Sequence, residues 1–517
     1  MFILTQAYDL RYSLFVMRSS NVMPPLPGHE FVTSNGIKTR IALRSTYVLA
    51  FAVIALSGCS VGPRYKQPIT KLQPYHNAPA IESRTTMLPA PSLDKWWTGF
   101  NDPALTKIVE RALSQNLDLA ASFTLVQQAR AVAQEAGAQR MPDINIEGDS
   151  TASRASLDSP TGRLAPEFPG AFQRNSNYLD LGIGATWETD IFGSLRRGAE
   201  AANAEAQAAE EERLGTRVSV AAEAADAYMQ IRGAQVRLAF AKQQISTDEH
   251  LRSLVSQRKN AGVASDRELA QAEALLAQAR STVPQLNIIF EAQLNRLDVL
   301  MGAQPGTYAT ELKVPLDIPT LPNIANTLDA SDLIRRRPDI VAAERRIAAS
   351  NARIGQAIAE YYPKISLAAL LGTEAISPGD LFRERAFQPA AVASLRWRLF
   401  DFGRVDAEVK QARGANAEAL VQYRSSVLRA TEDVEDAFNA LAQSESRRDE
   451  LAREISSLQR AKDLSEQSYK AGVIPLTDVL DADRQLLVAK DDLASTREDA
   501  ARAAVSSFRA LGGGWTP

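Results

Sequence analysis

Residues 187–193 read Trp-Glu-Thr-Asp-Ile-Phe-Gly, and residues 397–403 read Trp-Arg-Leu-Phe-Asp-Phe-Gly. These two stretches are 210 residues apart, and the Ala-Gly-Val at 261–263 returns at the same offset, at 471–473. A shared offset means that the segment between the two marks has the same length in both copies, as an internal repeat requires. The sequence therefore predicts two repeats built around an element of fixed length.

That element is predicted to be a long helix. Gly193 is separated from Gly262, and Gly403 from Gly472, by 68 residues without a proline. At 1.5 Å per residue, such a helix is roughly 100 Å long. Apolar residues recur every seven positions in the second copy, which is typical of coiled-coil packing: Leu420, Val427, Val434 and Leu441. The glycine that ends each run predicts a turn into a returning helix.

Four segments alternate between apolar and polar residues, at about 143–152, 178–189, 364–373 and 390–399. Tilted strands of about ten residues have the length that crosses an outer membrane, with apolar side chains toward lipid. An ordinary half-buried hairpin shows the same pattern. Four strands cannot close in lipid, where unpaired edges are costly, so closure needs partner chains. Two chains would give an eight-stranded barrel filled by side chains, and three would give twelve strands around a water-filled lumen.

The N-terminal region predicts an exported lipoprotein. A basic segment that includes Arg44 precedes an apolar run over 45–55, and Leu-Ser-Gly-Cys follows at 56–59. This run is too short to span a bilayer comfortably and ends in small residues, so we interpret it as a cleaved signal with a lipobox. Cys59 would then be the lipidated first residue of the mature chain. Residues 1–37 are interpreted as an over-extended start, and a genuine extension is the alternative.

Composition argues against several classes of function. The 517 residues include three histidines, far apart in sequence, and one cysteine, so neither a metal site nor a cysteine nucleophile is expected. Glycine-rich nucleotide motifs and Gly-x-Ser-x-Gly do not occur. The net charge of −3 argues against a nucleic-acid partner. We therefore predict no enzyme activity, no cofactor and no metal; a glycosidase is a weak alternative, because carboxylates occur in pairs.

Several separate motifs carry a family resemblance. They are the Cys-Ser-Val-Gly-Pro-Arg-Tyr-Lys at 59–66, the Trp-Trp-Thr-Gly-Phe-Asn-Asp-Pro-Ala-Leu at 96–105, the two Phe-Gly sites, and the stretch from Tyr469 to Ala482. In this order, over 59–512, the chain resembles the TolC-like outer-membrane efflux ducts. It fits best the lipoprotein (NodT-type) subunits of resistance-nodulation-division efflux systems.

The resemblance implies a mainly α-helical fold with transmembrane β-structure. A trimeric, twelve-stranded outer-membrane β-barrel, with four strands per chain, would continue into a long periplasmic α-helical barrel. It implies a lipid-anchored homotrimer in the outer membrane of a Gram-negative bacterium, extending into the periplasm. A periplasmic membrane-fusion adaptor and an inner-membrane resistance-nodulation-division pump would be its partners. The duct would passively export small toxic compounds.

The resemblance also implies a gate at the periplasmic end. Its residues would be Asp478 and Asp481 in the second copy, Glu268 at the equivalent of Asp478, and Tyr469. Ile474 stands where the archetype of the family has an arginine, so the latch of the gate must differ. Charges that complement the dipole at a helix N-terminus are the simpler explanation for the aspartates.

The predicted layout has six parts. They are a signal peptide over 1–58, a proline-rich tether and equatorial segment over 59–103, a first repeat over 104–302, an equatorial linker over 303–330, a second repeat over 331–512 and a tail over 513–517. Within the repeats the long helices cover 193–302 and 402–511. The barrel–helix junctions are marked by Trp187, Phe192, Gly193, Trp397, Phe402 and Gly403.

The same duct serving protein or polysaccharide secretion with an ATP-driven transporter is the alternative function. A coiled-coil envelope lipoprotein is a third possible function.

Overall fold

The structure is a computed structural model of the chain. It describes residues 60–70, 72–84, 88–160, 162–164, 174–324 and 330–516. The predicted signal segment and the predicted lipidation site, Cys59, lie outside these residues.

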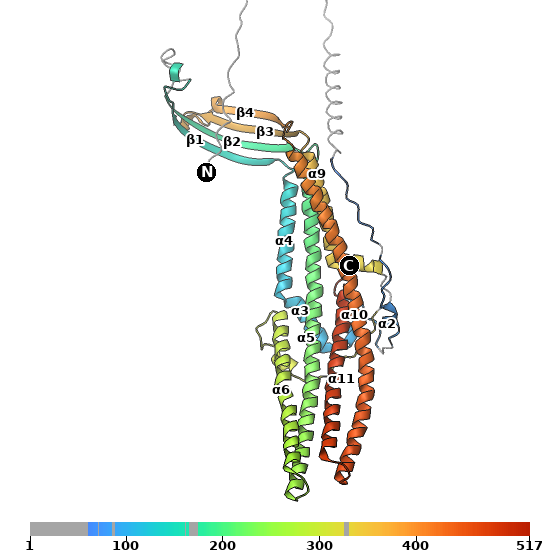
Figure 1. The fold of residues 1–517 in the computed structure, drawn as a ribbon. Coiled ribbons are helices and arrows are strands. Elements are labelled where there is room, and N and C mark those ends of the chain that lie inside the picture. Colours follow the sequence, from blue (N-terminus) through green and yellow to red (C-terminus); the bar gives the residue numbers. More distant parts are fainter. Residues whose placement is uncertain are drawn as a thin grey trace, which may run out of the picture. The chain divides into compact units, whose positions relative to one another are not determined.

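Two helical hairpins of equal dimensions form most of the fold (Figure 1). Helices α5 (Ser194–Asn260) and α10 (Arg404–Lys470) have 67 residues each, and α6 (Asp266–Leu300) and α11 (Leu476–Ala510) have 35 each. Gly193 and Gly403 precede the long helices with φ of +83° in both, a left-handed conformation that is unstrained only for glycine. Identical lengths and identical entry geometry confirm that the fold is built from two repeats.

Each repeat also contains a shorter helix that runs alongside a long one. Helices α4 (Leu117–Ala138) and α9 (Pro338–Ala359) have 22 residues each. Helix α4 packs on α5, whereas α9 packs on both α5 and α10 and so joins the two repeats. Among the residues that the structure describes, no helix combines the length and apolar character needed to cross a membrane.

The four predicted strands are present as one antiparallel sheet in the order β1-β2-β3-β4. Their bounds are β1 Asp143–Arg154, β2 Asn175–Thr189, β3 Lys364–Ala375 and β4 Phe387–Arg396. The prediction that the last strand continues to 399 is wrong for the single chain. Strand β4 ends where Arg396 pairs with Lys364, the first residue of β3, so residues 397–399 have no strand opposite them.

The register places apolar residues on one face of the sheet. Ile183 lies opposite Ile146 on one side and Leu371 on the other, and Trp187 lies opposite Leu367. Direct cross-strand neighbours share a face, because successive side chains alternate. Several large apolar side chains of the sheet are exposed in the single chain: Ile144, Ile146, Ile183, Leu371 and Leu395. An apolar sheet face of this size is expected to contact lipid or another chain.

The main core lies where the N-terminal segment crosses the helices. The 3₁₀ segment Leu93–Phe100 buries Trp96, Trp97 and Phe100, and the Trp96 ring stacks on Phe508 of α11 at 5.3 Å. Helix α3 (Pro103–Gln115) follows, with Asp102 as its N-cap. The short helices α2 (Ala78–Glu82), α7 (Ala309–Leu312) and α8 (Ala330–Arg336) complete the connecting segments. The Trp-Trp motif of the sequence therefore anchors this segment to the end of α11.

Candidate functional site

The repeated tryptophans make the same contact in each copy. The Trp187 Nε1–H donates to the Arg140 carbonyl oxygen at 3.0 Å, and the Trp397 Nε1–H donates to the Tyr361 carbonyl oxygen at 2.9 Å. Both acceptors lie just after the short helix of their repeat, α4 or α9. Trp187 lies near the end of β2, and Trp397 directly follows β4. Each tryptophan therefore ties the end of the second strand of its repeat to the helix that precedes the first strand.

The two junction phenylalanines differ. The Phe192 ring stacks on Tyr362 of the second repeat, with 4.6 Å between ring centroids. The Phe402 side chain is 100% exposed, and its φ of +56° is unusual for a residue other than glycine. The first junction is thus covered by the second repeat, and the second junction is uncovered in the single chain.

The residues that follow Cys59 are fixed against the first junction. The Val61 N–H donates to the Phe192 carbonyl oxygen at 3.1 Å, and the Arg197 Nε–H donates to the Val61 carbonyl oxygen at 3.2 Å. A Cβ atom on Gly62 would lie 2.4 Å from the Gly355 Cα, so only glycine fits there. The predicted lipid-bearing residue is therefore next to a segment that is held at the start of α5.

At the far ends of the hairpins, Tyr469 is buried between the two repeats. It belongs to a small apolar cluster with Val255, Ala272, Leu476 and Val479. The guanidinium carbon of Arg258 lies 4.3 Å from the centroid of the Tyr469 ring, and Arg258 Nη1 donates to the Tyr469 carbonyl oxygen at 3.3 Å. Burial raises the pKa of the Tyr469 hydroxyl. We call this arrangement, Tyr469 with Arg258, the tip latch.

Sequence analysis missed Arg258. Its equivalent in the second repeat is Ser468, so the repeat pattern does not mark it. Ile474, at the position of the family's arginine, packs against the same apolar cluster. The cation of the tip latch therefore comes from α5, the hairpin opposite the one that carries the tyrosine.

The predicted gate carboxylates have separate partners within the described part of one chain. Glu268 forms a capping box with Ser265: the Ser265 N–H donates to Glu268 Oε2 at 2.7 Å, and the Glu268 N–H donates to Ser265 Oγ at 3.3 Å. The hydrogen bond from the Ser265 backbone lowers the pKa of Glu268. Within one chain, Glu268 therefore caps helix α6.

The two aspartates lie in the first turns of α11 and are exposed. Asp481 accepts hydrogen bonds from Arg484 at 2.8 Å and from Gln485 at 2.7 Å. Among the residues described, Asp478 accepts only a long hydrogen bond, 3.4 Å, from the Thr477 hydroxyl. Asp478 is therefore the less neutralised of the two.

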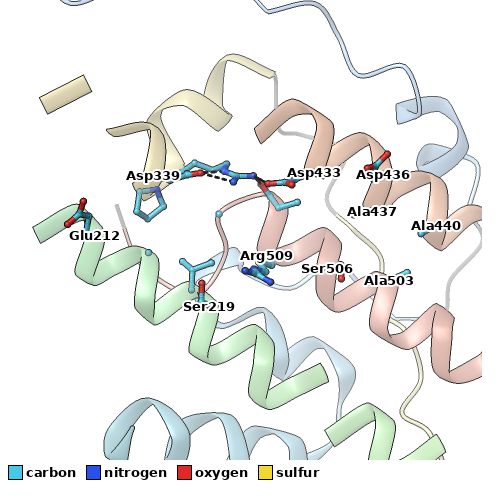
Figure 2. A pocket seen from close by; sticks show the side chains of 16 residues that line it. Glu212, Ser219, Asp339, Asp433, Asp436, Ala437, Ala440, Ala503, Ser506 and Arg509 are labelled. Carbon is cyan, nitrogen blue, oxygen red and sulfur yellow. Dashed lines mark hydrogen bonds and ion pairs between the residues drawn. The ribbon is translucent and has the colours of Figure 1, made fainter. Parts of the chain in front are cut away.

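A cavity of about 710 Å³ lies where the end of α11 meets the start of α9 (Figure 2). Arg337 forms ion pairs across it with Asp339 at 2.7 Å and with Asp433 at 2.8 Å. Figure 2 shows Ser219, Ser506 and Arg509 on the surrounding helices. The charged groups of this cavity form ion pairs between helix ends. Within the described residues, no group of three or more His, Cys, Asp or Glu could hold a metal ion.

Comparison with known proteins gives a consistent result. A family model described as "outer membrane efflux protein" matches residues 108–303 and 330–513. Nodulation protein T of Rhizobium leguminosarum bv. trifolii is 29% identical over 480 residues, which cover 91% of this chain and 98% of that protein. The pyoverdine export outer membrane protein OpmQ of Pseudomonas putida is 30% identical over 421 residues, which cover 81% and 88%.

Solved structures agree with the sequence relatives. The outer-membrane channel OprN superposes with a TM-score of 0.81 at 33% identity, and the match covers 89% of this chain and all of that one. The expected fold class, mainly α-helical with four barrel strands per chain and two internal repeats, is confirmed. The expected location in the outer membrane of a Gram-negative bacterium is confirmed as well. This fold is that of a channel and not of an enzyme. The chain belongs to the outer membrane efflux protein family and is the outer-membrane channel of an efflux system.

Proposed function

We propose that the chain works as a homotrimeric, passive duct in which twelve strands close one barrel. The observation that carries this proposal is the complementarity of the two free sheet edges. Within the described residues, β1 and β4 each pair on one side only. Unpaired backbone groups in lipid cost several kcal/mol each, so both edges need a partner.

The repeat predicts how the free edges pair. Strands β2 and β3 join the two repeats within one chain, with Trp187 opposite Leu367 and Thr186 opposite Ala368. Strand β4 is the equivalent of β2, because Trp397 lies 210 residues after Trp187. Strand β1 is the equivalent of β3, because Lys364, the first residue of β3, lies 221 residues after Asp143, the first residue of β1. Transferring the register places Trp397 opposite Ile146 of the partner subunit.

This register matches the chemistry of both edges. Arg396 would lie opposite Glu147 of the partner subunit, a charge pair that stabilises a sheet by about 0.2–1 kcal/mol. Leu399 would lie opposite the partner's Ile144, so pairing would extend β4 to the end that its sequence predicts. Phe402, 100% exposed, would cover Met141 of the partner subunit, 66% exposed, as Phe192 covers Tyr362 within the chain. Three subunits are proposed because twelve strands leave a water-filled lumen and eight do not.

Cross-linking tests the register. Arg396→Cys combined with Glu147→Cys should give covalent dimers and trimers on non-reducing gels. The matched control is Arg396→Cys with Asp149→Cys, which is two residues along the same face. Diagonal neighbours are about 7–8 Å apart, beyond the Cα separation that a disulfide accepts, so the control should cross-link far less. Stronger cross-linking of the control would refute the register, and a monomeric mass in detergent would refute the trimer.

We also propose a periplasmic adaptor and a resistance-nodulation-division pump as partners, with small toxic compounds as cargo. The relatives named for toluene efflux and for pyoverdine export support small-molecule cargo. Co-expression with such a pump and adaptor should restore dye efflux in cells that lack their own outer-membrane channel. Restoration only with an ATP-driven secretion transporter would favour protein or polysaccharide export instead.

Lipidation of Cys59 is supported by the contacts of the residues that follow it. Ser60 to Gly62 are held at the junction between β2 and α5, next to Phe192. Acyl chains on Cys59 would thus leave the protein near the end of β2, where they can enter the membrane. A diacylated cysteine at this place would add a lipid anchor to a barrel that already spans the bilayer.

For the gate, we propose that Asp478 and Asp481 from three subunits line the periplasmic mouth and that the tip latch holds the hairpins together there. A ring of carboxylates attracts cations and repels anions. Asp478→Asn with Asp481→Asn should therefore lower cation selectivity and weaken block by trivalent cations in single-channel recordings. Unchanged selectivity and block would show that these aspartates are helix-end charges and that the tip latch holds the mouth closed without them.

A further inference from the structure

Two aspartates are buried between the hairpins, above the tips. Asp248 on α5 and Asp483 on α11 are each 1% exposed. The Gln244 side-chain amide donates to both carboxylates, to Asp248 Oδ1 at 2.8 Å and to Asp483 Oδ2. One amide thus bridges carboxylates from two different repeats. We call the two aspartates the carboxylate pair.

The charges at the carboxylate pair do not balance when both groups are ionised. Lys462 of α10 forms an ion pair with Asp483 and is the cation at this place. Asp248 Oδ2 has no hydrogen-bond donor among the residues described. A buried carboxylate with one unsatisfied oxygen is costly, and of two neighbouring carboxylates one normally keeps its proton. A proton on Asp248 Oδ2 would turn that unsatisfied acceptor into a hydrogen-bond donor and leave one negative charge for one lysine.

In the described part of the chain, the neighbouring charged groups do not provide a second cation for the carboxylate pair. Glu466 and Lys470 follow Lys462 on α10, and Glu466 lies 4.0 Å from Lys462 and 3.9 Å from Lys470. Asp481 of α11 is paired with Arg484, and on the α5 and α6 side the charged groups pair with each other: Arg252 with Glu273, and Glu249 with Arg280. His250 lines the adjoining cavity of about 530 Å³ and bonds to the Ser246 carbonyl oxygen.

We propose that the carboxylate pair is a proton-dependent brace between the two hairpins, so that loss of the shared proton loosens the contact of α5 with α11 and favours opening of the tips. Neither the repeat pattern nor the family resemblance points to these residues. The contact itself is independent of the proposed function, whereas its effect on opening rests on the proposed gate at the tips.

The sign follows from the surroundings. Burial, and then the charge of Asp483, raise the pKa of Asp248 from its ordinary value of 3.8 to about 7. A group whose pKa is raised in the packed state stabilises that state fully below its ordinary pKa, and the stabilisation is lost as pH rises toward the raised value. The contact should therefore weaken between about pH 4 and pH 7, by up to about tenfold per pH unit.

Hydrogen–deuterium exchange of the intact channel tests the brace directly. After correction for intrinsic exchange, protection of residues 476–486 should fall at least tenfold between pH 5 and pH 7 in the wild type. Asp248→Asn keeps the shape and the bond from Gln244 without a charge, so protection should stay at its acidic level throughout. Asp463→Asn is the matched control, because Asp463 is an exposed aspartate beside Lys462. It should respond to pH as the wild type does.

A second variant keeps the proposal testable if Asp248→Asn does not fold. Asp483→Asn removes the second carboxylate and leaves Asp248 beside Lys462, so the pKa of Asp248 should fall and the pH response between 5 and 7 should shrink by a different route. Single-channel recordings should show openings that become more frequent from pH 5 to pH 7 in the wild type but not in Asp248→Asn. A wild-type pH response of 476–486 that survives in both variants, or no response in the wild type, would overturn the brace. If Asp248→Asn loses the pH response of exchange but its single-channel recordings still change with pH as in the wild type, the brace stands and only its link to the gate is overturned.

Discussion

Replacing Arg258 by methionine should loosen the tip latch. The substitution keeps an unbranched side chain in the cluster but removes the cation that lies 4.3 Å from the Tyr469 ring. A partly desolvated cation–π contact contributes about 0.5–2 kcal/mol, and the hydrogen bond to the Tyr469 carbonyl adds about 1 kcal/mol. A loss of about 1.5–3 kcal/mol shifts the ratio of open to closed tips by about 10- to 150-fold per subunit.

Changes at Tyr469 separate the ring from its hydroxyl. Tyr469→Ala removes a buried aromatic ring and should cost about 3–5 kcal/mol, more than Arg258→Met. Tyr469→Phe should have a much smaller effect, because the Tyr469 hydroxyl is buried without a hydrogen-bond partner in the described structure. Its removal leaves no polar group unsatisfied.

The assay is leakage of a large glycopeptide antibiotic into cells that lack a partner pump, together with single-channel conductance of the purified channel. Val473→Ala is the control, because Val473 lies at the same tip and is 76% exposed. Leakage should be greatest in Tyr469→Ala, followed by Arg258→Met and then Tyr469→Phe, and least in Val473→Ala. Two results together would refute the cation–π latch: Arg258→Met leaks no more than the control, and Tyr469→Phe leaks as much as Tyr469→Ala. The effect would then belong to the Tyr469 hydroxyl.

Three further predictions concern the other parts of the chain. Cys59→Ser should abolish acyl-chain labelling and leave the signal uncleaved while barrel assembly survives; unchanged labelling would refute the lipobox. Leu395→Arg, on the apolar face of β4, should impair trimer assembly by about 2–4 kcal/mol near the midplane, and Ser394→Arg, on the other face, should be milder; equal damage would show that the facing is wrong. Gly193→Ala should lower the thermal stability more than Gly403→Ala. Both strain a left-handed φ, but only at Gly193 would the new Cβ meet another residue, Ser60, at 2.9 Å.

The repeated elements could be predicted from the sequence with little error. A fixed offset determines that the long helices have equal lengths, and they do, at 67 and 67 residues. The four strands are predictable for a different reason, because apolar and polar residues alternate along each of them. The end of β4 could not be predicted, because it depends on what lies opposite: Lys364 is the last partner that β3 offers within one chain.

Of the candidate site at the tips, the sequence predicts only a residue that stands in a recognisable motif. Tyr469 stands in a recognisable motif, and it is buried at the tip as a latch residue would be. Arg258 carries no such signal, because its role arises from the packing of the first hairpin against the second, which brings it to Tyr469. Glu268 was placed in the gate by equivalence with Asp478, yet its hydrogen bonds with Ser265 give it a capping role in the single chain. Equivalent positions in the two repeats therefore do not have equivalent partners.

The same asymmetry explains why the carboxylate pair could not be predicted. Asp248 and Asp483 are 235 residues apart, and each looks like a solvated charge on its own helix. Their equivalents in the other repeat are Leu458 and Glu273, so comparison of the repeats does not single them out. The repeats specify the scaffold that both copies share, whereas the proposed latch and brace use positions where the copies differ. Because both join unlike hairpins of one chain, the three subunits of a trimer would each carry a complete latch and brace, and a single substitution would change all three alike.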